Sequence, residues 1–147
     1  MAIRNLVEES NSILSKKAKK ITQYNEDLWE LLDDMKDTMH KEYGVGLAAP
    51  QVGVLKACAI VEVNNMFIEL LNPKIIEEIG NQCGSEGCLS IKGATGYVNR
   101  PEQITVEAED RYGNQFRLTA TGFLAVAICH EVDHLNGVLF TSKIIKE

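Results

Sequence analysis

Apolar residues between positions 25 and 43 follow a helical period. They recur at three- and four-residue steps, at Leu28, Leu31, Leu32, Met35 and Met39. Acidic residues stand between them and near the start of the segment, where the helix dipole favours negative charge. The pattern predicts an amphipathic helix near the N-terminus with one face against the core.

Strand-like composition dominates the middle of the chain. Residues 54–63 and 66–79 are rich in β-branched and other apolar side chains, and the pair 72–73, Asn-Pro, predicts a break in the second run. Residues 104–108 alternate apolar and polar positions, and after a turn sequence the strand character resumes at 116–119. The last two segments predict a β-hairpin.

A second helix is predicted from Thr121 or Gly122 to Asn136. It is apolar on most sides, which is typical of a buried helix, and Gly137 is placed to end it. Strands between two helices indicate an α+β fold rather than alternating βαβ units. We expect small mixed or antiparallel sheets around the central second helix, with the first helix as an N-terminal amphipathic one.

Composition agrees with one soluble domain spanning residues 1–147. The chain has 45% hydrophobic and 24% charged residues, enough apolar material for one core. No stretch approaches the roughly 20 apolar residues of a bilayer span, and the N-terminus lacks the apolar core of a signal peptide. We therefore expect a cytoplasmic protein with reduced cysteines.

The charge balance is acidic. Fifteen basic and 21 acidic residues give a formal net charge of −6, which disfavours binding to phosphate backbones and anionic membranes. One basic cluster, Lys16, Lys17, Lys19 and Lys20, is interpreted as the solvated face of a short helix. The sequence thus predicts neither direct nucleic-acid binding nor a membrane partner.

The second helix carries the segment His130-Glu131-Val132-Asp133-His134. Residues four apart share a helix face, so His130 and His134 can grip one metal ion. Glu131 then lies beside the metal, where a glutamate serves as general base for a metal-bound water in hydrolytic sites of this type. A polar motif within so apolar a helix indicates chemistry, because buried imidazoles and carboxylates are costly unless they are paired or bound to metal.

A catalytic site of this kind keeps three protein ligands and one open position. Only residues 138–147 follow the helix end, and their single carboxylate is the terminal Glu147, so the third ligand is expected upstream. Cys88 stands out because it lies in a glycine-flanked segment leading into a probable strand. Cys83, five residues earlier, competes with it, and His40 is a further candidate.

The segment Gly44–Gln51 matches a dinucleotide-binding Gly-x-Gly-x-x-Ala pattern, but in the wrong context. It follows a helix, whereas that pattern must follow a strand and open a helix. We interpret the glycines as allowing close backbone approach, and Gln51 as a polar group delivered to the same place. A simple helix end and loop is the alternative.

Together these segments resemble the peptide deformylase family. Three motifs, Gly44–Gln51, Glu86–Ser90 and His130–His134, occur in that family's order and approximate spacing, and the likeness covers most of the chain from Gly44 onward. The resemblance implies a bacterial or organellar enzyme that removes the formyl group from N-terminal formylmethionine. Its partners would be formylmethionyl nascent peptides.

The resemblance also implies a metal site. Cys88, His130 and His134 would bind the ion, and Glu131 would take a proton from the bound water and pass it to the departing amine. The family favours iron(II) in the cell, with zinc, nickel or cobalt able to replace it. A thiolate with two imidazoles is compatible with both iron and zinc.

Further roles follow from the same resemblance. The Gln51 side chain and the backbone N–H of Leu89 would hold the developing oxyanion together with the metal. Gly46 would offer its backbone to an extended substrate peptide. Asp133 and Arg100 could orient the ligands or form a plain structural ion pair.

The chain also departs from the usual family pattern. Lys92, Val126 and Cys129 replace a common proline, arginine and glutamine, which affects the expected substrate rim. The sequence ends soon after Ile145, without the C-terminal helix associated with ribosome docking in some members, so ribosome binding is left open. Two alternatives remain: a metallopeptidase-like amide hydrolase, and a non-catalytic module that binds formyl peptides.

Overall fold

The structure is a computed structural model of the 147-residue chain. It describes residues 2–8, 10–88, 91–139 and 143, with the backbone alone at 87, 88 and 91–95. The helices are η1 (Ser12–Ser15), α1 (Glu26–Lys41), η2 (Ala49–Val52) and α2 (Gly122–Leu135), where η1 and η2 are short 3-10 helices. The strands are β1 (Gly46–Ala48), β2 (Cys58–Val63), β3 (Met66–Ile79), β4 (Gln82–Cys88), β5 (Ile91–Arg100), β6 (Gln103–Glu109) and β7 (Gln115–Thr121).

Helix α1 begins where the sequence predicts. Asn25 caps it, because its side chain accepts a hydrogen bond from Leu28 N–H at 3.2 Å. Its buried face includes all five of the periodic apolar residues. The amphipathic helix is therefore confirmed. No helix in the described ranges is long and apolar enough to span a bilayer.

Two antiparallel sheets make up the β structure. The larger has the order β1-β2-β3-β6-β7, and the smaller is the β4–β5 pair. Successive residues of β2 face opposite sides of the larger sheet. Ile60 joins the core cluster around α1, whereas Val61 and Val63 join the cluster around α2. The two helices thus cover opposite faces of this sheet.

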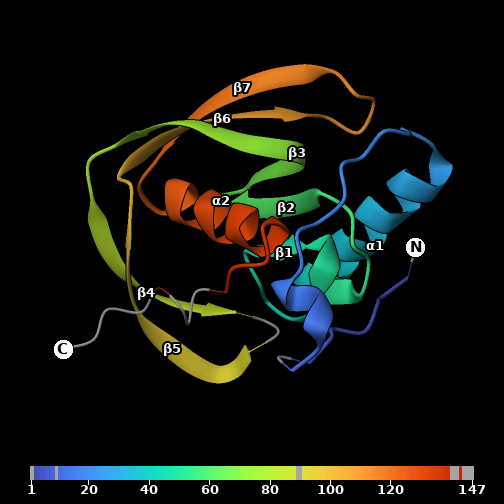
Figure 1. Ribbon diagram of the computed structural model, residues 1–147, viewed down its shortest axis with the longest axis horizontal. Helices are drawn as coiled ribbons and strands as arrows, with labels where there is room; N and C mark the ends of the chain where they lie inside the picture. The colour runs from blue at the N-terminus through green and yellow to red at the C-terminus, as the bar shows by residue number, and fades with distance from the viewer. Residues whose placement is uncertain (1, 9, 89–90, 140–142, 144–147) are drawn as a thin grey trace.

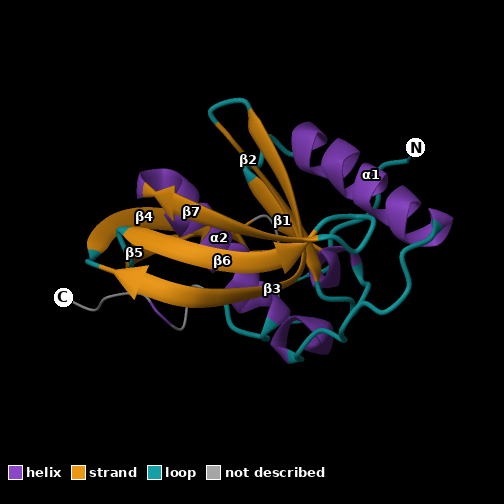
Figure 2. Cartoon of the chain, turned by 90° about the horizontal axis from the view of Figure 1, so that it is seen from above, coloured by secondary structure: helices purple, strands orange, loops and turns teal. Residues whose placement is uncertain are grey.

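Helix α2 occupies the middle of the molecule. It lies between the larger sheet and the β4–β5 pair, as Figure 1 shows. Seen from above, α1 lies at the opposite end of the molecule from β4 and β5 (Figure 2). Gly137 follows α2 with φ of 76°, the left-handed conformation that ends many helices. The predicted α+β fold with a buried central helix is confirmed.

Two local predictions were wrong. The predicted break at residues 72–73 is a bulge, because β3 continues through it with a register shift between Leu71 and Lys74. Asn72 takes φ of 49°, and its side chain binds both backbone groups of Ile21. The basic cluster is not on a helix either. After η1 ends at Ser15 the chain is extended, and Lys19 pairs with Lys56 in a parallel bridge.

Candidate active site

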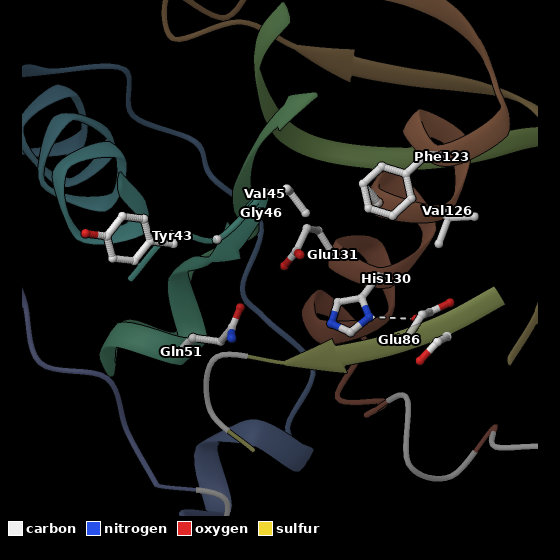
Figure 3. A pocket seen from close by; sticks show the side chains of 12 residues that line it. Tyr43, Val45, Gly46, Gln51, Glu86, Phe123, Val126, His130 and Glu131 are labelled. Carbon is white, nitrogen blue, oxygen red and sulfur yellow. Dashed lines mark hydrogen bonds and ion pairs between the residues drawn. The ribbon is translucent and has the colours of Figure 1, made fainter. Parts of the chain in front are cut away.

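A cavity of about 300 Å³ opens between β1, β4 and α2. Its lining residues are Tyr43, Gly44, Val45, Gly46, Gln51, Ser85, Glu86, Phe123, Val126, Ala127, His130 and Glu131. Figure 3 shows Gln51 and Glu131 approaching it from different elements, with His130 beside them. The cavity therefore combines members of all three sequence motifs. Val126, one of the departures from the usual family pattern, lies in its wall.

The two histidines of α2 lie together. Their ring centroids are 4.9 Å apart, and both residues are buried. Burial lowers the pKa of His134 to about 3, so its imidazole is neutral at physiological pH. Neutral imidazole is the form that binds metal ions. The predicted common face of His130 and His134 is confirmed.

A buried network of ion pairs and hydrogen bonds fixes the His130 ring. Its Nδ1 lies 2.8 Å from Glu86 Oε1. Arg100 donates to both oxygens of Glu86 at 2.9 Å, and to Asp133 Oδ2 at 2.5 Å. Burial alone would raise the pKa of Glu86, but the hydrogen bonds from Arg100 and His130 bring it to about 2. Glu86 is therefore ionised, and the His130 Nδ1–H donates to it, which makes Nε2 the nitrogen that could bind a metal ion.

Glu86 was not predicted as a site residue from the sequence. Arg100 and Asp133 were left open between orienting a ligand and forming a structural ion pair; the structure shows the ion pair, and it shows Arg100 bound to Glu86, which in turn contacts His130. Glu86 comes from β4, Arg100 from the paired strand β5, and His130 and Asp133 from α2. These contacts are long-range, so no local sequence pattern connects them.

Glu131 is buried without a full set of hydrogen bonds. It is 4% exposed, and its Oε1 has no hydrogen-bond partner among the described residues. Burial raises the pKa of this carboxyl to about 7. A buried carboxyl with an unsatisfied oxygen, next to two imidazoles, fits a bound cation and a water molecule. The donor set therefore suits the metal that the sequence predicts.

Gln51 is held by backbone contacts on both sides. Its Oε1 accepts a hydrogen bond from Ala48 N–H at 2.9 Å, which makes the side-chain nitrogen the end that can donate toward the cavity. Val7 N–H donates to the Gln51 carbonyl at 2.8 Å. The N-terminal segment thus supports η2, and Gln51 is the delivered polar group that the sequence predicts.

The remaining candidate site residues are Cys88, Leu89, Cys83 and His40. The Cys88 side chain and the whole of Leu89 lie outside the described residues, so their predicted roles stay predictions. Cys83 is exposed on β4, and His40 contacts Glu62 at 2.9 Å on the surface. Within the described part, no three His, Cys, Asp or Glu side chains gather as a metal site.

Gly46 lies against the carboxyl of Glu131. A Cβ built at Gly46 would be 2.5 Å from Glu131 Oε2 and 3.0 Å from its Cδ. Gly46→Ala is therefore expected to displace this carboxyl and to lower kcat for the reaction proposed below by roughly 10- to 100-fold. Steady-state kinetics would measure it.

Gly84→Ala in β4 is the matched control, because its added Cβ would meet no atom within 4 Å. We expect it to keep near-normal kcat. Equal rates for the two variants would show that the Gly46 contact does not position Glu131.

Known proteins resemble this chain along its whole length. The profile of a family described as polypeptide deformylase matches residues 3–147. The peptide deformylase of Caldicellulosiruptor bescii is 49% identical, over 99% of this chain and 88% of that protein. The peptide deformylase of Alkaliphilus metalliredigens is 48% identical, over all of both chains.

Solved structures agree with these sequence matches. The crystal structure of the Thermotoga maritima peptide deformylase aligns with a TM-score of 0.97 and 32% identity, over 99% of this chain and 100% of that one. The Legionella pneumophila peptide deformylase aligns with a TM-score of 0.94 and 40% identity, over 98% and 87%. Both likenesses extend across the α+β fold described above.

Proposed function

Because this chain belongs to the polypeptide deformylase family, we propose that it hydrolyses the formamide of N-terminal formylmethionine on newly synthesised proteins. It is an enzyme, a hydrolase of N-terminal protein processing. The observation that carries the proposal is the buried Glu131 carboxyl, which shares one cavity with Gln51 and His130.

Cys88, His130 and His134 would hold the metal, with iron(II) as the proposed ion and zinc, nickel or cobalt as substitutes. Support comes from the neutral His134 and from Glu86, which directs the Nε2 of His130 away from itself. When bound, the ion would act as a Lewis acid toward the formyl oxygen and the attacking water.

Glu131 would move the proton. It takes a proton from the attacking water as the new C–O bond forms, and gives it to the amine nitrogen as the C–N bond breaks. Formate and a free N-terminal amine leave. The Gln51 side chain and the Leu89 N–H would donate hydrogen bonds to the oxyanion of the tetrahedral intermediate.

The cavity walls suit a methionyl peptide. Val45, Phe123 and Val126 present apolar surface to a thioether side chain. Among the described strands, β1 pairs with β2 alone, so its other edge is open to an extended peptide. Gly46, the first residue of β1, would offer its backbone there.

Formate release from formyl-Met-Ala-Ser tests the proposal. Protein purified anaerobically with iron(II) is expected to release formate from this peptide and no acetate from its acetylated counterpart. Removal of the metal with a chelator is expected to abolish release, and iron(II) to restore it. Cleavage of the Met-Ala bond would instead support a metallopeptidase, and peptide binding without turnover a binding module. Either result would contradict the proposal.

A further inference from the structure

Five exposed lysines lie where the N-terminal segment pairs with the chain just before β2. They are Lys16, Lys17, Lys19, Lys20 and Lys56, and we call them the lysine patch. Lys19 and Lys56 are partners in the parallel bridge, which places these two side chains next to each other.

The backbone beneath the patch is fixed. Lys19 N–H donates to the Leu55 carbonyl at 3.0 Å, and Ala57 N–H donates to the Lys19 carbonyl at 2.8 Å. Ala18 N–H donates to Leu135, the last residue of α2, at 2.8 Å. Ala18, between Lys17 and Lys19, and Ile21, after Lys20, are both buried. The charged groups therefore stand on a rigid base rather than on a mobile loop.

The segments that supply the patch, residues 10–25 and 45–61, carry no acidic residue of their own. None of the five ammonium groups forms an ion pair with a described carboxylate. Without the patch the chain has 10 basic and 21 acidic residues, a charge of −11. The net charge of −6 therefore combines a basic patch with a more acidic remainder of the chain.

Two hollows lie at the patch. One of about 200 Å³ is lined by Lys17 and Lys20, and another of about 380 Å³ by Lys19, Lys20 and Lys56. Neither shares a residue with the cavity beside Glu131. The patch is thus a second surface, separate from the candidate active site.

The kinds of side chain at the patch indicate which class of partner it fits. Residues 15–23 and 54–57 contain no exposed large hydrophobic side chain. Membrane surfaces and protein partners normally need apolar anchors in addition to charge. Without an exposed aromatic ring the patch also lacks a platform for stacking single-stranded bases. Point charges on a rigid surface suit the phosphates of double-helical regions instead.

We propose that the lysine patch binds the phosphate backbone of folded RNA without sequence preference. The choice of RNA rests on the proposed function, because an enzyme of newly synthesised proteins works where RNA is the abundant polyanion. The acidic net charge, and the interpretation of the lysines as a solvated helix face, predicted no nucleic-acid contact. In the structure the lysine segment is extended and not helical, and the segments that supply the lysines contain no acidic residue, so neither reason applies to the patch.

Fluorescence anisotropy with a labelled RNA hairpin of about 16 base pairs tests the proposal. The full chain is expected to bind with a Kd of roughly 10 to 100 µM near 50 mM salt, and more weakly as salt rises. Lys19→Gln with Lys56→Gln should raise Kd at least about fivefold and reduce the salt slope by about 2. Adding Lys17→Gln and Lys20→Gln should abolish binding.

The matched control removes two exposed cations elsewhere, with Lys41→Gln and Arg117→Gln, and should leave Kd within about twofold. Equal Kd values for the two double variants, or no RNA binding by the unaltered chain, would overturn the proposal. All these variants should release formate from a free formyl peptide at the normal rate. The RNA result and the formate result can therefore fail separately.

Discussion

Replacing Glu131 with glutamine is expected to lower kcat for formate release by at least about a thousandfold. Glutamine keeps the shape of the side chain but can neither accept the proton of the attacking water nor pass it to the amine. Its KM should change little, because the Gln51 side chain and the apolar wall remain. Single-turnover measurements with formyl-Met-Ala-Ser would give the rate directly.

The same variant should keep or raise the thermal stability of the metal-free protein. Glu131 is 4% exposed and its pKa is raised by burial, so the folded state bears a cost for this carboxyl that a neutral amide relieves. Melting with a chelator present would measure it. A variant that retained normal kcat would remove Glu131 from the mechanism. A large fall in Tm would instead make the residue a structural one.

Replacing Arg100 with methionine is expected to destabilise the fold by about 3–5 kcal/mol. Arg100 is 3% exposed, and its loss leaves Glu86 with a buried charge held by His130 alone. The His130 ring should then lose its fixed orientation, so metal affinity should fall about 10- to 100-fold. Denaturant unfolding of the metal-free protein and a metal titration would measure the two effects separately.

The control for this variant is an exposed ion pair. Arg117 contacts Glu107 at 3.1 Å, and its side chain is 69% exposed. Arg117→Met should change stability by about 1 kcal/mol or less, because solvent screens such pairs. Adding Glu86→Leu to Arg100→Met should restore part of the lost stability, since no unpaired charge remains between them. If Arg100→Met costs no more than Arg117→Met, the network does not stabilise the fold.

Local periodicity predicted the helices well. The expected segments 25–43 and 121–136 differ by at most two residues at each end from α1 and α2. Each pattern reflects one apolar face or a fully apolar helix, so it can be recognised without knowing which elements the helix packs against. Strand β4 was missed because its sequence, QCGSEGC, has neither alternation nor β-branched residues, and pairing with β5 stabilises it instead.

In the site too, features that depend on local spacing were predicted, and features that depend on long-range contacts were not. The His130–His134 spacing predicted that the two imidazoles share one face, because both residues lie on one helix. The contact between Gly46 and Glu131 joins residues 85 apart in sequence. The sequence alone indicated that Gly46 permits close approach, but it did not indicate that Glu131 is the residue that approaches. The roles of Glu86 and the rigid base of the lysine patch also depend on tertiary contacts.

The bond from Ala18 to Leu135 joins residues 117 apart, so it closes a loop of nearly the whole chain. Beside it, a Cβ at Gly137 would be 2.7 Å from the carbonyl of Ser15, so the end of η1 and the segment that follows α2 are in direct contact. Such contacts of high sequence separation form late, because their loop-closure entropy must be offset by other structure first. During synthesis, α2 therefore cannot dock against the N-terminal segment before residue 135 has been made, and the active site can assemble only after that point.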